Sequence, residues 1–395
     1  MTVTAPASPR QGVAFAMAAL LLAALNLRVA VTSVGPVLAE IRTGLGMTGP
    51  VAGLLTSLPV VCFALFGFAA PRLARRFGTA TVVAAGLLVT VTGTIIRPYA
   101  GSTALFILLT GVALAGVAVV NVLLPMIVKE RFADRAGFVT GLYTVSLNVG
   151  ATGAAAATVP LTAALGGDWR LGLAVWAVLG VLAVPPWFFL ARRRAAEVRA
   201  TPPPAPPLRL LRSPVAWALA VYFGMQSSSA YVIIGWLSQI YRDAGLSPAK
   251  AGVLFGLTSA LGVPLGFVIT TYAGRIRSQS LIALAVGLAG IAGYVGLWFD
   301  PAAAPWVWAV LLGIGNCAFP LVLTMIALRG STPATVGRLS AFGQGVGYIF
   351  AIPIPILVGA LHDATDGWRV PLTLMIALMI PQIIGGMQAG RDRQV

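Results

Sequence analysis

The chain has 395 residues, of which 58% are hydrophobic and only 9% are charged, and its mean hydropathy is +0.94. Soluble globular proteins average about a quarter charged residues, so this composition excludes a soluble globular protein and predicts an integral membrane protein. The formal net charge of +16 would suit a nucleic-acid binder, but the basic residues lie in short loops between apolar segments, which is typical of membrane topology instead.

Twelve apolar segments divide the chain, and each is close to the ~20 residues that cross a hydrocarbon core of ~30 Å. Their length and the spacing of their small residues favour helices over strands. The segments cover residues 13–38, 49–70, 79–99, 103–128, 137–164, 170–191, 214–240, 248–273, 279–299, 303–328, 335–361 and 368–389. The sequence therefore predicts an all-α membrane protein with twelve transmembrane helices.

The first segment carries a positive charge, Arg28, near its centre. An arginine near the bilayer centre costs from about 2.5 to above 10 kcal/mol, so it is kept only where it faces protein, water or a ligand. No Asp or Glu lies in any predicted span, so Arg28 has no evident fixed partner and indicates a site for anions or strongly polarised groups. The alternative is an arginine that packs between helices and binds backbone carbonyls.

Further polar residues lie at mid-membrane positions of four spans. Thr32 follows Arg28 by one turn and shares its helix face. The others are Asn121 in the fourth span, Gln226, Ser229 and Tyr231 in the seventh, and Asn316 in the tenth. A buried amide without a partner is costly, so these side chains should face protein or water. Each could contact a ligand or form a hydrogen bond between helices, since such bonds are common in membrane bundles.

The two halves of the sequence are related by a near-constant shift. Residues 46–53 resemble residues 245–252, and Trp169-Arg170 reappears as Trp368-Arg369, at the same offset. Between the halves, three arginines at 192–194 precede a proline-rich run at 201–207, which cannot form a helix. We therefore expect an N-terminal six-helix bundle (1–191), a linker (192–213) and a C-terminal bundle (214–395). Parallel repeats of this kind place a central site between the two halves.

The loops predict the orientation of the chain. Of the 26 Lys and Arg residues, nineteen fall in the tails and loops on the side of the termini, six fall on the opposite side, and Arg28 lies within a span. Because cytoplasmic loops carry the excess of Lys and Arg, both termini are expected in the cytoplasm of a multi-pass cell-membrane protein.

Several short motifs resemble the major facilitator superfamily and, within it, the cyanate/2-nitroimidazole transporter family. These motifs are Asn-Leu-Arg at 26–28 with Ser-Val-Gly-Pro at 33–36, residues 53–59 leading to 72–78, residues 121–125, and Gln226 with Tyr231 and Trp236. The resemblance implies that spans 1, 4, 7 and 10 surround a cavity, into which the polar residues above would converge around Arg28. Arg75 replaces the aspartate usual in the loop between helices two and three, and Val29 replaces a proline frequent after the arginine.

An enzyme is not expected. His362, the single histidine, lies at the periphery, and no carboxylate pair or phosphate-binding loop is present. Cys62 and Cys317 lie in separate apolar segments and are predicted to be small core residues. We therefore predict no metal and no cofactor.

The predicted function is secondary or facilitated transport, by alternating access, of a small anionic or polar solute such as a cyanate-like anion or a nitroimidazole-like heterocycle. The alternatives are an efflux carrier for drugs or metabolites with the same fold and a membrane sensor that does not transport. The protein is expected to act as a monomer in the lipid bilayer, without nucleic acid. All ten acidic residues are placed in loops or at helix ends, so no carboxylate proton relay is predicted at the midplane. Any coupled proton would travel on the substrate or act near the mouth opposite the termini, through Glu40 or His362.

Overall fold

The first half of the protein consists of six membrane spans, several of them interrupted. The computed structural model describes residues 9–66, 69–193, 210–331 and 333–394. The helices of the first half are α1 (Pro9–Thr32), η1 (Gly35–Val37), α2 (Leu38–Leu45), α3 (Gly49–Phe66), α4 (Ala69–Phe77), α5 (Thr79–Ile96), η2 (Arg97–Tyr99), α6 (Thr103–Arg131), η3 (Ala133–Arg135), α7 (Ala136–Ala164), α8 (Trp169–Ala174) and α9 (Ala177–Arg193).

The second half also has six spans, of which the first, α10, is unbroken. Its helices are η4 (Leu210–Arg212), α10 (Pro214–Asp243), α11 (Pro248–Ala260), α12 (Gly262–Ala273), α13 (Ser280–Phe299), α14 (Pro305–Asn316), α15 (Ala318–Arg329), α16 (Pro333–Ala351), α17 (Pro353–Thr365) and α18 (Arg369–Ala389). Eleven of the described helical segments are long and apolar enough to cross a membrane. The 29-residue α7 supplies the twelfth crossing, which confirms the all-α membrane fold.

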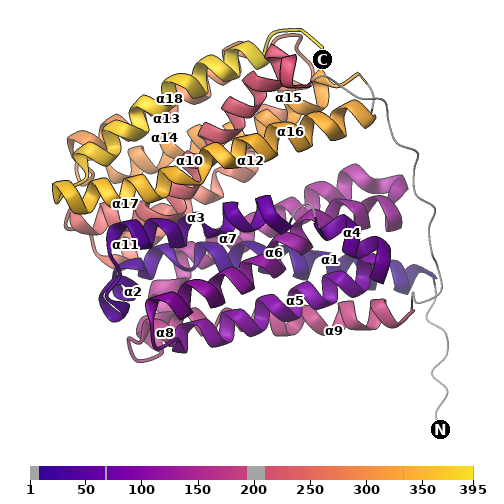
Figure 1. The fold of residues 1–395 in the computed structure, drawn as a ribbon, viewed down its shortest axis with the longest axis horizontal. Coiled ribbons are helices and arrows are strands. Elements are labelled where there is room, and N and C mark those ends of the chain that lie inside the picture. Colours follow the sequence, from indigo (N-terminus) through magenta and orange to yellow (C-terminus); the bar gives the residue numbers. More distant parts are fainter. Residues whose placement is uncertain (1–8, 67–68, 194–209, 332, 395) are drawn as a thin grey trace.

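The two halves lie side by side, the indigo-to-pink helices against the red-to-yellow ones (Figure 1). They contact each other where α3 packs along α17 and α7 packs along α11. The described chain begins and ends at the same end of the bundle, and we call the opposite end the distal end. Most of the predicted linker, residues 194–209, lies outside the described residues, so the domain boundaries remain a prediction.

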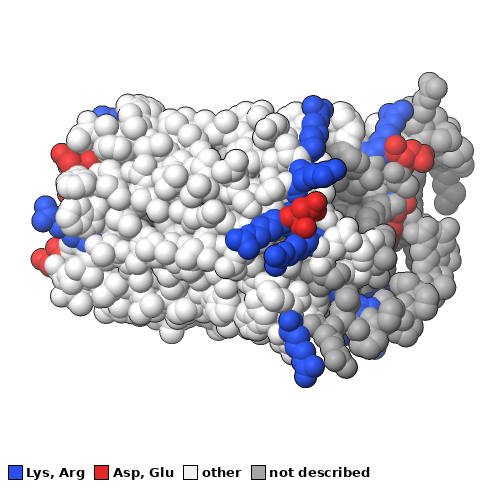
Figure 2. Space-filling model, turned by 90° about the horizontal axis from the view of Figure 1, so that it is seen from above, with Lys and Arg blue, Asp and Glu red and all other residues white. Residues whose placement is uncertain are grey.

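Charged side chains are confined to the two ends of the molecule on the face shown in Figure 2. The wide band between them is uncharged, as expected for a surface that contacts lipid. Lys and Arg are more numerous at the end where the described chain begins and ends. This distribution follows the predicted excess of basic residues on that side.

The first span is longer than predicted and is broken. It extends from Gly12 to Leu45 instead of ending near residue 38. The α-helix stops at Thr32, and a 3₁₀ turn at Gly35–Val37 leads into α2. Pro36 lacks a backbone N–H and so cannot continue the hydrogen-bond ladder of α1, which explains the break in this region. The break lies one turn beyond Arg28 and brings the end of a helix close to that charge.

Candidate substrate site

Arg28 lies on α1 at the middle of the first span, and its side chain is half-buried. Its guanidinium forms no ion pair or hydrogen bond with any residue that the structure describes. Leu27 and Ala30, which lie beside Arg28 on α1, share a buried hydrophobic cluster with Tyr231 on α10, and Tyr348 on α16 packs against the same cluster. Since α1 belongs to one half and both tyrosines belong to the other, this cluster lies where the two halves face each other, next to Arg28.

Packing fixes the two tyrosine rings. Tyr231 is 6% exposed and belongs to a hydrophobic cluster that includes residues of α1. The ring of Tyr348 stacks on Phe63 at a centroid distance of 6.2 Å and meets the edge of Phe223 at 5.0 Å. Aromatic contacts at these distances stabilise one ring orientation. The hydroxyls are therefore held in place independently of any solute.

The last turn of α1 is held by three different donors. The Thr32 hydroxyl donates to the Arg28 carbonyl at 2.9 Å, and the Ser33 N–H donates to the Val29 carbonyl at 3.1 Å. Arg97, from η2, donates through Nη2 to the Ala30 carbonyl at 3.1 Å. Thr32 is buried, so its hydroxyl serves the backbone of its own helix in this structure.

The other polar residues predicted for the site lie inside the second half. Gln226 donates to Asn316 Oδ1 at 2.9 Å, and its own carbonyl oxygen accepts from Gln382 on α18 at 3.0 Å. Ser229 and Tyr294 share a hydrogen bond of 2.7 Å between their hydroxyls. These contacts bridge α10 to α13, α14 and α18 and give the side chains of Gln226 and Ser229 partners without a solute, while Gln382 Oε1 has no partner among the described residues.

Asn121 lies on α6, which packs against α1. Its side chain is half-buried and forms no hydrogen bond with a described residue. Like Arg28, Asn121 therefore has side-chain polar atoms without a hydrogen-bond partner among the described residues. The structure thus places Tyr231 in the cluster beside Arg28, links Gln226 to Asn316, and gives Ser229 a partner in Tyr294.

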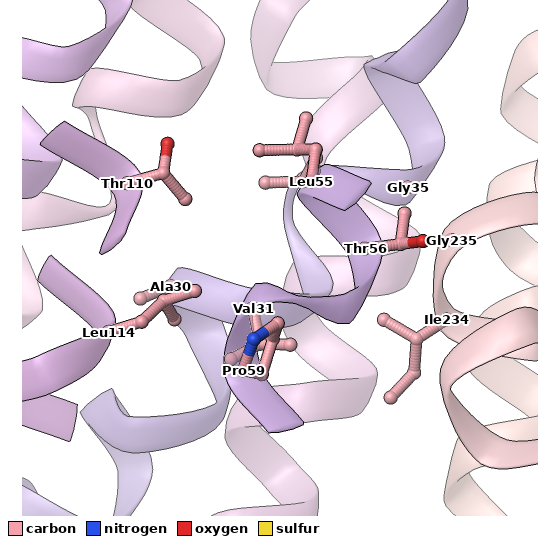
Figure 3. A pocket seen from close by; sticks show the side chains of 11 residues that line it. Ala30, Val31, Gly35, Leu55, Thr56, Pro59, Thr110, Leu114, Ile234 and Gly235 are labelled. Carbon is pink, nitrogen blue, oxygen red and sulfur yellow. The ribbon is translucent and has the colours of Figure 1, made fainter. Parts of the chain in front are cut away.

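A small cavity is lined by Ala30 and Val31, which follow Arg28 on α1, and by residues of the neighbouring helices (Figure 3). It is lined by residues of α1, α3, α6 and α10, among them Ala30, Thr56, Thr110 and Ile234. Its volume is about 20 Å³. A cavity of this size holds about one water molecule, so it is too small for a solute to pass.

Close backbone contacts seal the distal side of this cavity. A β-carbon on Gly35 would overlap the carbonyl oxygen of Ile234, and one on Gly49 would overlap that of Gly359. Each contact joins the first half to the second. Glycine allows this approach because no side chain separates the two backbones.

Two ion pairs reinforce the closed distal end. Arg42 contacts Asp363 at 2.9 Å, and Arg242 contacts Glu40 at 2.8 Å. The guanidinium of Arg42 also lies 5.7 Å from the ring centroid of Trp236 on the opposite half. We call the Arg42–Asp363 and Glu40–Arg242 pairs the distal latch.

His362 lies beside the latch and is less exposed than a solvated surface histidine. Its ring is 4.3 Å from the centroid of Trp368 and 6.3 Å from that of Trp236. Its nitrogens lie 3.3 Å from Asp363 and 3.8 Å from Asp243. The imidazole therefore lies against one carboxylate of the latch.

The chemistry available around Arg28 is that of a cation with two phenol hydroxyls. Among the described residues, no group of three His, Cys, Asp or Glu side chains could hold a metal ion, and Cys62 and Cys317 are both buried free thiols. A guanidinium and hydroxyl donors suit a negative or strongly polarised group, which Arg can contact through two parallel hydrogen bonds.

Two residues of this region were not identified from the sequence. Arg97 was counted as a loop residue, but the structure buries it completely against α1. Tyr348 was not singled out because a tyrosine in an apolar span is an ordinary core residue. The sequence offers one signal: Tyr348 follows the polar residue Gln344 by four positions, so the two side chains lie on one helix face.

Residues 20–355 match the sequence profile of the Major Facilitator Superfamily. The chain belongs to this superfamily. Two relatives in it cover nearly the whole protein. One is the 2-nitroimidazole transporter of Escherichia coli, 35% identical over 96% of this chain and 96% of its own length. The other is the cyanate transport protein CynX of E. coli, 32% identical over 91% of this chain and 94% of its own length.

The superfamily fold is also found by comparison with solved structures. A bacterial homologue of the human lysosomal transporter Spinster, in an inward-facing and unoccupied conformation, has a TM-score of 0.79. It is 15% identical and covers 99% of this chain and 100% of its own. Family, relatives and fold together identify the protein as a multi-pass membrane transporter and not an enzyme.

Proposed function

We propose that this transporter carries a small anionic or strongly polarised solute, which binds to Arg28 between the two halves of the protein. The main support is that Arg28 is half-buried at the centre of a membrane span and has no ion pair among the described residues. A charge in that position is expensive unless a ligand or water compensates it. Tyr231 and Tyr348 would complete the site from the opposite half, with Thr32 and Asn121 nearby.

The names of the two relatives suggest a class of substrate. Cyanate is an anion, and 2-nitroimidazole carries partial negative charge on its nitro oxygens. Both are small and present a compact, electron-rich end that a guanidinium and phenol hydroxyls can bind. We propose that this shared chemistry, and not a full negative charge, is what the site around Arg28 recognises.

The transport cycle would alternate access to this site. The distal end is closed by backbone contacts and by the latch, so a solute would reach Arg28 from the end that carries the termini. Rocking of the two halves would then open the distal side. With the termini in the cytoplasm, as the basic loops predict, the distal end would face outward.

The experiment that tests this function combines binding with flux. Purified protein is screened by thermal shift against cyanate, other small anions and nitroimidazoles, and each ligand found is followed in liposome flux. We expect Arg28→Ala to weaken binding about 10- to 100-fold, because a charge-assisted hydrogen bond is lost. Arg28→Lys should retain part of the affinity if charge dominates, and lose it if the planar geometry of arginine matters.

Arg170→Ala is the matched control, since Arg170 is a partly exposed arginine that lies over the ring of Trp169 at the distal end. It should leave binding unchanged. Wild-type affinity and flux in folded Arg28→Ala protein would refute the proposed site. Binding without any flux would instead indicate a sensor.

A further inference from the structure

Arg97 is a second arginine inside the membrane region. It lies in η2, at the end of the third span, and its side chain is 0% exposed. Its Nη2 donates to the Ala30 carbonyl, while Nε and Nη1 have no hydrogen-bond partner among the described residues. A cation buried with so few partners is costly, and an apolar side chain of similar volume would often be more stable. Among the described residues, the hydrogen bond to the Ala30 carbonyl is the contact through which the Arg97 side chain can act on α1.

The Ala30 carbonyl belongs to the last turn of α1, which ends at Thr32. The final four carbonyls of a helix have no partner within it, and this end carries partial negative charge. A guanidinium there satisfies a free acceptor and interacts favourably with the helix dipole. Because Ala30 is two residues from Arg28, the arginine of η2 acts on the same turn that carries the proposed site.

The second half contains a bridge in the corresponding place. Ser229 lies 199 residues after Ala30, the offset that relates the two halves. Its hydroxyl bonds to that of Tyr294 on α13, the third span of the second half. In both halves, therefore, a buried polar side chain of the third span bonds to the first span at the position related by 199 residues. Ala30 accepts through its carbonyl in the last turn of α1, whereas Ser229 bonds through its hydroxyl within the unbroken α10. Each bridge holds the first span of its half to the third, and the bridge of Arg97 is the one of the two that acts on a helix end.

We propose that Arg97 is a positioning residue, which fixes the last turn of α1 and thereby the orientation of Arg28 toward Tyr231 and Tyr348. The proposal rests on the proposed function of Arg28 as the solute site. Arg97 is not expected to touch the solute, because it is fully buried and does not line the cavity in Figure 3.

The first measurement needs no substrate. Hydrogen–deuterium exchange is followed in the full-length protein in lipid nanodiscs, for wild type, Arg97→Gln and Arg97→Lys. We expect Arg97→Gln to raise exchange of the backbone amides within residues 29–36, where Pro36 carries none, roughly tenfold, the effect of losing a charge-assisted hydrogen bond. Arg97→Lys should restore most of the protection, since lysine can also bind a helix C-terminus.

Tyr294→Phe is the matched control, because it removes the corresponding bridge of the second half. It should raise exchange around Ser229 and leave residues 29–36 unchanged. If Arg97→Gln leaves exchange at 29–36 unchanged, or raises it equally throughout the first half, the proposal is wrong whether or not the protein binds a solute.

The second measurement is a double-mutant cycle with Arg28, using cyanate and 2-nitroimidazole as probes. In the wild-type background, Arg97→Gln should weaken binding about 3- to 10-fold. In the Arg28→Ala background the same substitution should have no further effect, because there is no guanidinium left to orient. Equal losses in both backgrounds would overturn the positioning role. An Arg28→Ala variant that binds like wild type would refute the proposed function, while the exchange data would still decide whether Arg97 holds α1.

Discussion

In the proposed site, the two tyrosines beside Arg28 would determine which solutes can be distinguished. A guanidinium alone attracts any anion, whereas hydroxyls in fixed positions favour a solute whose acceptors match them. Tyr348 is held by two aromatic contacts and Tyr231 by the hydrophobic cluster around α1. Selectivity should therefore depend on the hydroxyl groups more than on the rings.

We expect Tyr231→Phe and Tyr348→Phe each to lower affinity about 3- to 10-fold, since each removes one hydrogen bond and leaves the ring packing intact. The measurement is the dissociation constant of any solute found in the screen, together with the melting temperature. Tyr241→Phe is the control, because the Tyr241 hydroxyl donates to the Pro305 carbonyl, away from Arg28. Equal losses of affinity in all three variants would argue against a specific role for the two hydroxyls.

The amide group of Gln226 should behave differently. Gln226→Ala leaves an amide of Asn316 and one of Gln382 without their partner, which should lower the free energy of unfolding by about 1–3 kcal/mol. Thermal unfolding in detergent measures this, and affinity should fall less than it does in Tyr231→Phe. Gln344→Ala, which loses only a contact with Ser340 on its own helix, should have a smaller effect on stability. A large loss of affinity in Gln226→Ala without loss of stability would indicate that Gln226 contacts the solute.

Arg28 could be singled out from the sequence because a charged residue within an apolar segment is recognisable from the order of residues alone. The residues around it could not be sorted in the same way. Gln226, Ser229 and Tyr231 share one helix, and the direction of each side chain depends on how α10 is rotated against its neighbours. Arg97 lies at the end of a span, where solvated and buried arginines have the same local sequence.

At the level of helices, the distal latch couples α2 and α10 to the opposite half. Asp363 accepts hydrogen bonds from the side chain of Arg42 and from the backbone N–H of Gly49, so one carboxylate joins two elements of the first half. Partly exposed ion pairs each contribute about 0–1 kcal/mol, but a hydrogen-bonded charge contributes more. Asp363 should therefore matter most among the latch residues.

We expect Asp363→Ala to increase the population with an open distal end about 5- to 100-fold, as the loss of charged hydrogen bonds implies. Spin labels at the exposed positions Thr43 and Ala364 would report a longer distance when the end opens. Asp300→Ala is the control, because Asp300 is an exposed carboxylate that bonds only to a nearby backbone N–H in its own half. An unchanged distance distribution in Asp363→Ala would show that the glycine contacts alone keep the end closed.

The helices themselves were largely predictable. Span limits agree with the structure to within a few residues in most cases, because hydropathy and loop charge mark where a helix leaves the bilayer. The continuation of the first span to Leu45 was missed, since α2 carries Glu40 and Arg42 and reads as a polar loop. These charged residues lie in a helix and pair with Arg242 and Asp363 on the other half. A short stretch of sequence around Glu40 and Arg42 does not reveal these distant partners.

For the whole molecule, the positions of the acidic residues bear on energy coupling. Within the described residues, all Asp and Glu side chains belong to loops or helix ends, and Figure 2 shows red only near the two ends. Glu197 lies outside the described residues. A carboxylate relay at the bilayer midplane is therefore not expected.

We predict that 1-methyl-2-nitroimidazole, which has no titratable proton, equilibrates across liposomes without accumulating in response to an imposed pH gradient. Flux is compared with and without the gradient, in wild type, Glu40→Gln and His362→Ala. Strong accumulation that survives both substitutions would show that a proton path exists elsewhere. Accumulation that disappears in one of them would assign coupling to the distal end.

The repeat of 199 residues anticipated the arrangement of the molecule, because two copies of one helical pattern form two similar bundles. It did not reveal how the bundles meet. Contacts such as Gly35 with Ile234 depend on the relative tilt of the halves in one conformation, which the sequence encodes only as glycines among many others. The domain boundaries at 191 and 214 remain a prediction.

The distal end is closed by ion pairs and by glycine contacts, and these two kinds of contact differ in their sensitivity to the ionic strength of the solution. Its ion pairs are partly exposed, so dissolved salt weakens them, and the Debye length is only about 8 Å at 0.15 M ionic strength. Its glycine contacts carry no charge and are unaffected by salt. An increase in ionic strength on that side of the membrane would therefore loosen one component of the closure and leave the other in place. The medium at the distal end would thus tune how often the transporter opens toward it, without binding at the proposed solute site.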